Sequence, residues 1–311
     1  MKKLYFIAAA VVTSGLLSAQ TVIYSNTFES GVGDATIVGN GAIVDDASAG
    51  FGKVFHNAAG GQAIRANYLK LPETVFADLQ ASGQQALSIG FWVNKGTAVN
   101  NFWTPIFSAY GAAPVNNANT WPMMVLQSRL VAQVNVGGWT DLVDAQNVKG
   151  VNQASTAWLD DNGWHYYTAV FTATNVKVYV DGVIQNEWNL DGVTAGQVAA
   201  GLFTNGSELK YIALGGNQAW NWGDPDPAYK FDDVAVYASA LSVEQINAIR
   251  TAKSLSTALP GELHDKVLVS EDYFNLNGTK VSGTPKWFEK GSYIHRAVFS
   301  DGSIKTVKVI R

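Results

Sequence analysis

The stretch that decides the fold is Trp164–Trp188, which reads WHYYTAVFTATNVKVYVDGVIQNEW. Branched and aromatic residues alternate with polar ones in the runs 176–180 and 183–188, and the pair Asp181-Gly182 separates the two runs. Both central residues of a type I′ turn need positive φ, which favours Asp and Gly at these positions. An Asp-Gly pair between two alternating runs therefore predicts a β-hairpin.

A second informative stretch is Phe231–Ile249. It begins with the alternating run FDDVAVY, which predicts a strand, and continues through ALS into VEQINAI. Ser242 precedes this last run, and Gln245 follows three residues later, which is the spacing of a capping box. The pattern predicts a strand followed by a short helix.

These segments resemble the laminin-G-like, concanavalin A-like lectin/glucanase superfamily of jelly rolls, over about residues 21–255. The matching motifs are the core strands Leu87–Val93 and Pro105–Ser108, the pair Trp164-His165, the hairpin Val178–Gly182, and the closing strand and helix Phe231–Ile249. The resemblance implies an all-β chain folded as an antiparallel β-sandwich, a concanavalin A-like jelly roll. It does not identify a ligand, because one fold can host both enzymes and binding modules.

The residue pattern in the rest of the sequence favours the same architecture. Short alternating runs recur between clusters of Gly, Asn and Asp, which is typical of an antiparallel sandwich. The predicted strands are Ala86–Val93, Met123–Leu126, Leu130–Val136, Tyr166–Phe171, Lys177–Val180, Tyr211–Leu214 and Asp232–Tyr237. Helices are expected at 72–80 and 243–253, and Trp92, Trp164 and Trp188 are assigned to the core.

Residues 1–19 have the features of a secretory signal peptide. A basic start, an apolar run over 4–17 and small residues precede Gln20. An uncleaved membrane anchor is the alternative, although the run is short for a membrane span. Removal of the signal would leave a secreted or cell-surface protein with no transmembrane span. The chain has no Cys, so its extracellular core must be stable without disulfides.

The charge of the chain argues against nucleic acid as a partner. The formal net charge is −4, and the Lys and Arg residues are scattered along the sequence. Nucleic-acid binding needs a concentrated basic face. Only 15% of the residues are charged, whereas Asn, Gly, Ser, Thr and Trp are plentiful. Such a polar but largely uncharged surface suits neutral ligands.

The C-terminal part of the chain is predicted to be a separate small β-domain. The jelly roll is expected over 20–253, a linker over 254–261 and the small domain over 262–311. The segments Tyr273–Val281 and Lys290–Ile294, with a basic, branched last strand, resemble the sorting domains that Bacteroidetes use for type IX secretion. This resemblance implies the type IX secretion machinery as a partner. No Y-P-N-P-like opening is present, and an accessory β-domain is the alternative.

The sequence offers no recognisable catalytic motif. The laminarinase-like glycosidases of the superfamily carry E-x-D-x-x-E on one strand to place paired carboxylates in the cleft, and this string is missing. H-E-x-x-H and G-x-S-x-G are missing too. His165 stands at a strand start without a placed nucleophile, which favours packing over catalysis. We therefore expect no enzyme, with a divergent glycosidase as a minor alternative.

A calcium site is predicted from three carboxylates, Glu29, Asp232 and Asp233. They lie in the segments NTFESG and FDDV, and similar chain ends hold Ca²⁺ in calcium-dependent carbohydrate-binding modules. Alternation along the strand places Asp232 on the same face as the expected core residues, where an unpaired carboxylate would be costly. Oxygen ligands suit Ca²⁺, but backbone amides or Lys230 could equally satisfy this carboxylate.

The predicted ligand site is an aromatic-rich loop over 215–229. Its Gly, Asn and Pro content indicates a loop, and its aromatic rings could stack on the apolar faces of sugars. Trp103, with Trp121 and Trp139, could form the opposite wall. The alternative is that these rings fold inward and plug the sandwich. The predicted ligand-binding residues are Trp103, Asn217, Trp220, Trp222, Asp224 and Tyr229.

Taken together, the sequence predicts a non-catalytic protein that binds a glycan or glycoprotein at or near a cell surface. The alternative from another class is an adhesion or matrix component that binds protein, in which the same loops form a flat interface. Loss of glycan retention on removal of the loop tryptophans would distinguish the two.

Overall fold

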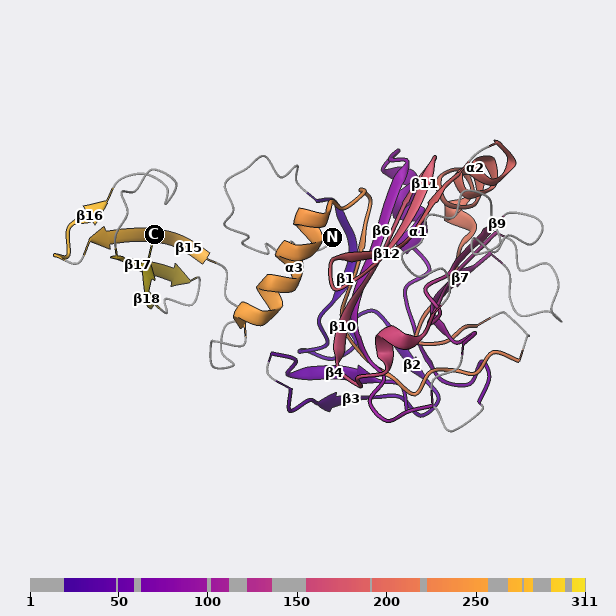
Figure 1. The fold of residues 1–311 in the computed structure, drawn as a ribbon, viewed down its shortest axis with the longest axis horizontal. Coiled ribbons are helices and arrows are strands. Elements are labelled where there is room, and N and C mark those ends of the chain that lie inside the picture. The colour runs from indigo at the N-terminus through magenta and orange to yellow at the C-terminus, as the bar shows by residue number, and fades with distance from the viewer. Residues whose placement is uncertain are drawn as a thin grey trace. The chain divides into compact units, whose positions relative to one another are not determined.

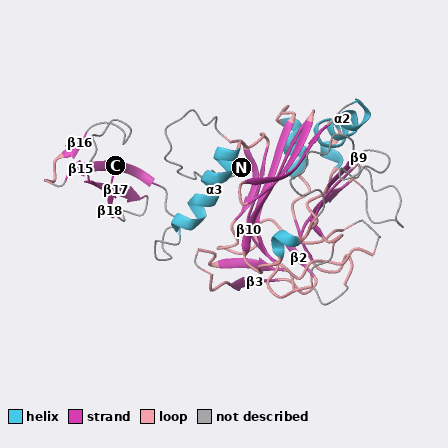
Figure 2. Ribbon diagram, viewed as in Figure 1, coloured by secondary structure: helices cyan, strands magenta, loops and turns pink. Residues whose placement is uncertain are grey.

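The computed structural model describes residues 20–48, 50–58, 63–99, 102–111, 122–135, 155–190, 192–218, 223–256, 268–275, 277–281, 292–299 and 304–310. Residues 1–19 with the predicted signal peptide, and most of the predicted linker, lie outside these ranges. The chain divides into two compact units between Ser254 and Leu255. Antiparallel strands dominate both units (Figures 1 and 2).

The larger unit is a sandwich of two antiparallel sheets, as the sequence predicts. In the eight-stranded sheet the order is β12-β11-β10-β6-β14-β4-β3, and β1 also pairs with β14. The strands are β12 (Val183–Asn189), β11 (Asn175–Val180), β10 (Trp164–Thr172), β6 (Ala86–Asn94), β14 (Lys230–Tyr237), β4 (Lys53–His56), β3 (Ala42–Asp45) and β1 (Val22–Asn26).

The second sheet has six strands in the order β2-β5-β13-β7-β8-β9. These strands are β2 (Thr36–Val38), β5 (Tyr68–Lys70), β13 (Tyr211–Leu214), β7 (Pro105–Tyr110), β8 (Met123–Gln127) and β9 (Ala132–Asn135). Sequential strands β7, β8 and β9 form a meander, whereas β13 joins β5 from a distant part of the chain.

Side-chain alternation builds the core between the two sheets. On β6, Leu87, Ile89, Phe91 and Val93 are fully buried in the main hydrophobic cluster, as period-2 alternation requires. Trp188 is fully buried as expected. The core assignment of Trp92 and Trp164 is wrong, because both are only half-buried. Trp92 belongs to a different hydrophobic cluster, which also includes Tyr166 and residues of helix α3 (Val243–Ser256).

The hairpin that the Asp-Gly pair predicts is present between β11 and β12. Asp181 has φ +52° and Gly182 φ +76°, which is the conformation of a type I′ turn. A Cβ on Gly182 would collide with Asn247 on α3, so the turn packs directly against this helix. The capping box of α3 is confirmed as well, since Ser242 N donates to Gln245 Oε1 at 2.8 Å and Gln245 N donates to Ser242 Oγ at 3.3 Å.

The other helical segments are short. Helix α1 (Val75–Ala81) overlaps the predicted one, and its Val75, Phe76 and Leu79 enter the core. Helix α2 (Gly192–Ala199) and the π-helical turn Ala200–Thr204 were not predicted. No helix in the described part of the chain is long and apolar enough to cross a membrane.

The smaller unit contains a four-stranded antiparallel sheet in the order β16-β15-β17-β18. Its strands are β15 (Leu268–Asn275), β16 (Lys280–Val281), β17 (Ser292–Phe299) and β18 (Ile304–Ile310). Tyr273 stacks on His295 across β15 and β17, with ring centroids 4.5 Å apart. The expected β-structure of this region is therefore present.

Candidate ligand-binding site

Three chain segments meet at one end of the six-stranded sheet. Pro105 at the start of β7 pairs with Gln127 at the end of β8, so the chain before β7 and the turn after β8 emerge together. Gly215, just after β13, donates its backbone N–H to Ile106 O at 2.9 Å. This sheet end therefore gathers residues 102–104, residues 128–131 and the start of the loop that follows β13.

Trp103 forms an exposed aromatic platform at this end. Its side chain is 43% exposed, and the adjacent Phe102 is 40% exposed. The two rings meet edge to face with centroids 5.3 Å apart. The Arg129 guanidinium carbon lies 3.9 Å from the Trp103 ring centroid, close enough for a cation–π contact. One face of the indole is thus supported by the protein while the side chain remains partly open to solvent.

Arg129 is itself held rigidly. It is only 3% exposed, and its Nε donates to Gln127 Oε1 at 2.6 Å. The residue before it, Ser128, donates its N–H to Thr104 O at 2.8 Å and accepts a 2.7 Å hydrogen bond from Trp158 Nε1. These bonds tie the turn after β8 to the residue that follows Trp103, so the guanidinium and the indole are fixed relative to each other.

Asp224 adds a carboxyl group within the electrostatic range of Arg129. It is partly buried, and burial raises its pKa to about 6, while the Arg129 charge acts in the opposite direction. Burial raises the pKa of Tyr110 on β7, and the charge of Asp224 adds a smaller increase. Arg129 contacts Trp103 and acts on the charge of Asp224, more than a hundred positions further along the chain, and we therefore include this carboxyl in the candidate site.

The loop that carries Asp224 is anchored by two buried polar side chains. Asp226 accepts backbone hydrogen bonds from Arg65, Ala66 and Asn67 at 2.8–2.9 Å. The Asn57 Nδ2 group contacts three carbonyl oxygens, those of Asn67, Gly215 and Pro227. These bonds hold the 215–227 loop against the 63–67 segment. The two residues of the acidic pair Asp224-x-Asp226 therefore differ: Asp226 is buried and anchors the loop, whereas Asp224 is only half-buried.

The structure places the six predicted ligand-binding residues differently. Trp103 and Asp224 belong to the site described above. Asn217 is 1% exposed and Tyr229 is fully buried beside Phe231, so neither side chain faces solvent, and their role in ligand binding stays a prediction. Trp220 and Trp222 lie outside the described residues. Inward packing, which the sequence left open as an alternative for the loop, applies to Tyr229.

The three carboxylates of the predicted calcium site do not fit a shared ion. Glu29 Oε2 accepts a 3.3 Å hydrogen bond from Lys53 N. Asp232 Oδ2 lies 2.5 Å and Asp233 Oδ2 lies 3.0 Å from Lys253 Nζ. Among the described residues, no group of three or more His, Asp or Glu could hold a metal. An ammonium group thus stands beside the two aspartates where the sequence suggested a cation, and calcium binding stays a prediction.

Lys253 compensates a carboxylate that the fold buries completely. Asp232 is 0% exposed, and burial followed by the charge of Asp233 raises its pKa, while Lys253 opposes this shift. Asp233 N also donates to Asp232 Oδ1 at 2.9 Å. The sequence offered Lys230 for this role, but Lys230 pairs instead with Asp46 at 2.7 Å and helps to lower the pKa of Asp46 to about 2 despite partial burial.

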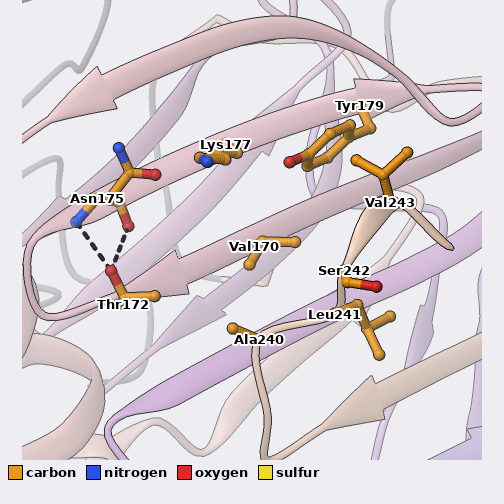
Figure 3. Close-up of a pocket in the computed structure, with 9 residues that line it drawn as sticks. All are labelled: Val170, Thr172, Asn175, Lys177, Tyr179, Ala240, Leu241, Ser242 and Val243. Atoms are coloured by element: carbon orange, nitrogen blue, oxygen red, sulfur yellow. Dashed lines mark hydrogen bonds between the residues drawn. The ribbon is translucent and has the colours of Figure 1, made fainter. Parts of the chain in front are cut away.

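A second hollow lies on the outer face of the eight-stranded sheet, and Figure 3 shows its lining. This groove, of about 360 Å³, runs between β10, β11 and the connection from β14 to α3. Lys177 Nζ lies 3.4 Å from Glu187, and Asn175 Nδ2 donates to the same carboxylate at 3.1 Å. Because these polar groups along the groove already bind a protein carboxylate, we assign it no ligand.

Sequence reasoning missed Arg129. The turn Ser128-Arg129-Leu130 carries no motif, and Leu130 adopts φ +65°, a conformation that its side chain does not predict. Only the pairing of β7 with β8 brings Arg129 onto Trp103. A basic residue between two predicted strands was the sole available signal.

Comparisons with known proteins fix the family of the sandwich. Among curated proteins, none matches this chain. The structure of domain 4 of AbnA, a GH43 extracellular arabinanase from Geobacillus stearothermophilus, in complex with arabinotriose, is similar at 18% identity and TM-score 0.47, covering 73% of this chain and 97% of that one. The binding domain of botulinum neurotoxin DC in complex with SialylT is similar at 12% identity and TM-score 0.42, covering 88% and 68%.

Neither likeness is close enough to transfer a ligand or an activity to this chain. The family model is more informative, because it matches residues 63–247, which is more than half of the chain. That range includes β5 to β14, the Trp103 platform, Arg129 and Asp224. The chain belongs to the concanavalin A-like lectin/glucanases superfamily.

Proposed function

We propose that this protein is a secreted or cell-surface carbohydrate-binding protein without catalytic activity, and that the Trp103 site receives the glycan. The observation that carries the proposal is the supported indole: Trp103 is 43% exposed, and the Arg129 guanidinium lies 3.9 Å from its ring centroid. An exposed aromatic ring that is already fixed loses little side-chain entropy when it stacks on a ligand.

The neighbouring groups suit a polyhydroxylated ligand. Aromatic rings bind the apolar C–H faces of sugar rings, and Asp224 supplies acceptor oxygens for hydroxyl groups. Ligand sites commonly combine apolar or aromatic surface with a few fixed polar groups, and the Trp103, Arg129 and Asp224 cluster has this composition.

An alternative function is binding of a protein in adhesion. Phe102 and Trp103 are adjacent and both exposed, and aromatic residues are enriched at the centres of protein interfaces. In that case the two rings would be buried against a partner protein, and no sugar would be retained. The two functions therefore predict opposite results on a glycan array.

The export route belongs to the same proposal. The sheet of β15–β18, together with the sorting-type motifs in 262–311, supports delivery by type IX secretion. Expression of the chain with and without residues 262–311 in a Bacteroidetes host tests this point. Retention of the truncated chain inside the cell is expected, and equal secretion of both chains would contradict it.

The test of the proposed function is a glycan array probed with the full chain and with Trp103→Ala, in Ca²⁺ and in EDTA. Retention of one glycan class by the parent chain is expected, with a loss of about tenfold or more in the variant, which corresponds to about 1.4 kcal/mol of binding free energy. Val99→Ala, at a 76% exposed apolar position four residues earlier in the sequence, is the control and should bind like the parent.

Three outcomes decide between the alternatives. A blank array from a folded parent chain would favour the adhesion function and move the search to a protein partner. Equal retention by the parent and Trp103→Ala would exclude this site. Conversion of a retained glycan to shorter products would replace the binding function by a hydrolytic one.

A further inference from the structure

His165 lies between two carboxylates and takes no part in the site above. Its Nδ1 is 2.7 Å from Asp181 Oδ2, and its Nε2 is 2.9 Å from Asp161 Oδ1. Asp161 belongs to the turn that precedes β10, whereas Asp181 belongs to the type I′ turn between β11 and β12. The imidazole therefore bridges two turns that are 20 residues apart in sequence.

This geometry requires a proton on each ring nitrogen. An ionised carboxylate only accepts hydrogen bonds, and a neutral imidazole carries a single N–H. Both short contacts can be hydrogen bonds only if His165 is an imidazolium. The carboxylates favour this form: the bond to Asp181, against an opposing effect of burial, raises the pKa of His165 above its ordinary value of 6.5.

The charged groups around the imidazole in the described residues come from four elements. Asp161 and Asp181 contact it directly. Arg250 of α3 lies 3.6 Å from Asp181 Oδ1, and it competes for the same carboxylate. Lys95, after β6, donates to Asn162 Oδ1 at 2.9 Å, next to Asp161. When the imidazolium loses its proton, Arg250 therefore remains beside Asp181, whereas Lys95 stays bonded to Asn162.

The two sides of the bridge differ in strength. Asp181 also accepts the backbone N–H of Tyr166 at 3.0 Å and contacts Arg250, and its side chain is 32% exposed. Asp161 is 65% exposed and has Gly163 N as its other donor, at 2.7 Å. A neutral His165 would keep its single N–H on the better-held Asp181, and its Nε2 lone pair would then face the Asp161 carboxylate.

The turn that carries Asp161, the weaker partner of His165, is connected to the candidate site through Trp158. The 3₁₀ turn Ala157–Leu159 directly precedes the Asp161 turn, and the Trp158 ring packs edge-on against the His165 ring at 5.9 Å. Trp158 Nε1 donates to Ser128 O at 2.7 Å, and Ser128 precedes Arg129 beneath Trp103. A shift of this 3₁₀ turn would move a hydrogen bond that fixes the site.

We propose that His165 is a proton-operated latch that holds the Asp161 turn and Trp158 in place when protonated, and that its deprotonation loosens the Trp103 site. The part that concerns ligand affinity rests on the proposed function. The latch itself is a property of the fold and can be tested without a ligand.

The sign of the pH dependence follows from the three groups. The contribution of His165 is fully present below pH 6.5 and is lost as the pH rises through its higher folded pKa. The pKa values of Asp161 and Asp181 are both lowered from 3.8. For Asp161 the causes are the hydrogen bonds from the backbone N–H of Gly163 and from His165. For Asp181 burial acts to raise the pKa, and the hydrogen bond from His165 outweighs this effect together with smaller contributions. Their contribution is present above pH 3.8 and is lost in stronger acid. The latch is closed between these limits.

The latch is tested by NMR titration of the full chain from about pH 4 to about pH 9, across the range in which His changes charge. The His165 resonance, assigned by its loss in His165→Gln, should show a midpoint above 6.5 and protons on both ring nitrogens below it. The Trp158 indole N–H should shift with the same midpoint. Asp161→Asn should lower that midpoint, while Asp160→Asn, one residue away, should not.

Affinity for the glycan retained on the array is measured in parallel near pH 7 and near pH 9, a range above the pKa of about 6 of Asp224, so that this carboxyl stays ionised throughout. A decrease of about fivefold in the parent chain and none in His165→Gln is expected for a coupled site. A His165 midpoint at or below 6.5, or one that Asp161→Asn leaves unchanged, overturns the latch. A titrating latch with unchanged glycan affinity overturns the coupling alone. A blank array removes the proposed function, whereas the NMR result still decides the latch.

Discussion

Two regions of the sandwich that carry paired aspartates, Asp232-Asp233 and Asp224-x-Asp226, differ in what surrounds the carboxylates. Asp232 and Asp233 on β14 both contact Lys253 of α3, which is 7% exposed, so this charge cluster is closed to ligands. Asp224 is partly buried near Arg129, and the same Arg129 supports an exposed indole. The first region is complete without a ligand, whereas the second presents surface to one.

The comparison shows that acidic residue pairs do not define a site by themselves. A buried carboxylate needs a counter-charge or hydrogen-bond donors, and the fold decides whether the protein supplies them. The bulge in the β14–β6 pairing between Asp232 and Ala235, with φ +45° at Asp233, helps bring both carboxylates to one lysine. In the described part of the chain no cation contacts Asp226, which instead accepts hydrogen bonds from three backbone amides.

The largest effect is expected when the closed cluster is opened. Lys253→Met leaves Asp232 fully buried without its ammonium partner, and breaking a buried pair in this way costs about 3–5 kcal/mol. Urea unfolding followed by tryptophan fluorescence measures the loss. Lys70→Met, at the exposed pair Lys70–Glu73, is the matched control and should cost no more than about 1 kcal/mol.

The Lys253→Met variant also tests the calcium prediction. In the parent chain Ca²⁺ would have to displace the ammonium group from Asp232 and Asp233. We therefore expect added Ca²⁺ to raise the Tm of Lys253→Met more than the Tm of the parent. Stabilisation of the parent that EDTA reverses would instead show a calcium site elsewhere in the chain.

An intermediate effect is expected at the anchor of the second region. Asp226→Ala removes the acceptor for the amides of Arg65, Ala66 and Asn67, and leaving such groups unsatisfied should cost roughly 2–4 kcal/mol. Glycan retention should fall as well, because the loop that carries Asp224 loses its hold. Full stability in this variant would show that water can replace the carboxylate.

The sequence predicts the sandwich well because its signals are local. Alternation over β6, β10 and β14 sets which residues enter the core, and Asp181-Gly182 sets a turn through two φ angles. The capping box likewise depends on two residues three positions apart. Each of these features is decided within a few residues, so no tertiary information is needed.

The candidate site is less predictable because its members meet only through tertiary contacts. Alternation predicted Asp232 on the face of Val234 and Val236, and this placement is wrong, because a bulge between Asp232 and Ala235 interrupts the alternation. Phe231 enters the main core instead, and Asp232 faces Lys253, which lies 21 residues away on α3. Tyr229 lies in a segment with the composition of a binding loop. It is also two residues before Phe231, so strand alternation points both rings to the same side, and both enter the core. Arg129 meets Trp103 only because β7 pairs with β8.

The smallest effect on stability is expected at Asp224. Unlike the two substitutions above, Asp224→Asn should stabilise the fold. Its folded pKa of about 6 exceeds the ordinary value of 3.8, so protonation of this group stabilises the fold below that range and the benefit is lost as the pH rises through about 6. Asp224→Asn should therefore leave stability nearly unchanged in acid and increase it near pH 8, by no more than about 1 kcal/mol because the group is partly solvent-screened.

Urea unfolding at several pH values measures this sign, and glycan affinity is read on the same samples. A more stable variant that binds less glycan would show that the carboxyl is retained for the ligand at a cost to the fold. A destabilised Asp224→Asn at pH 8 would mean that the Arg129 charge outweighs burial. Asp224 would then resemble Asp232, and the contrast between a closed and an open acidic region would no longer hold.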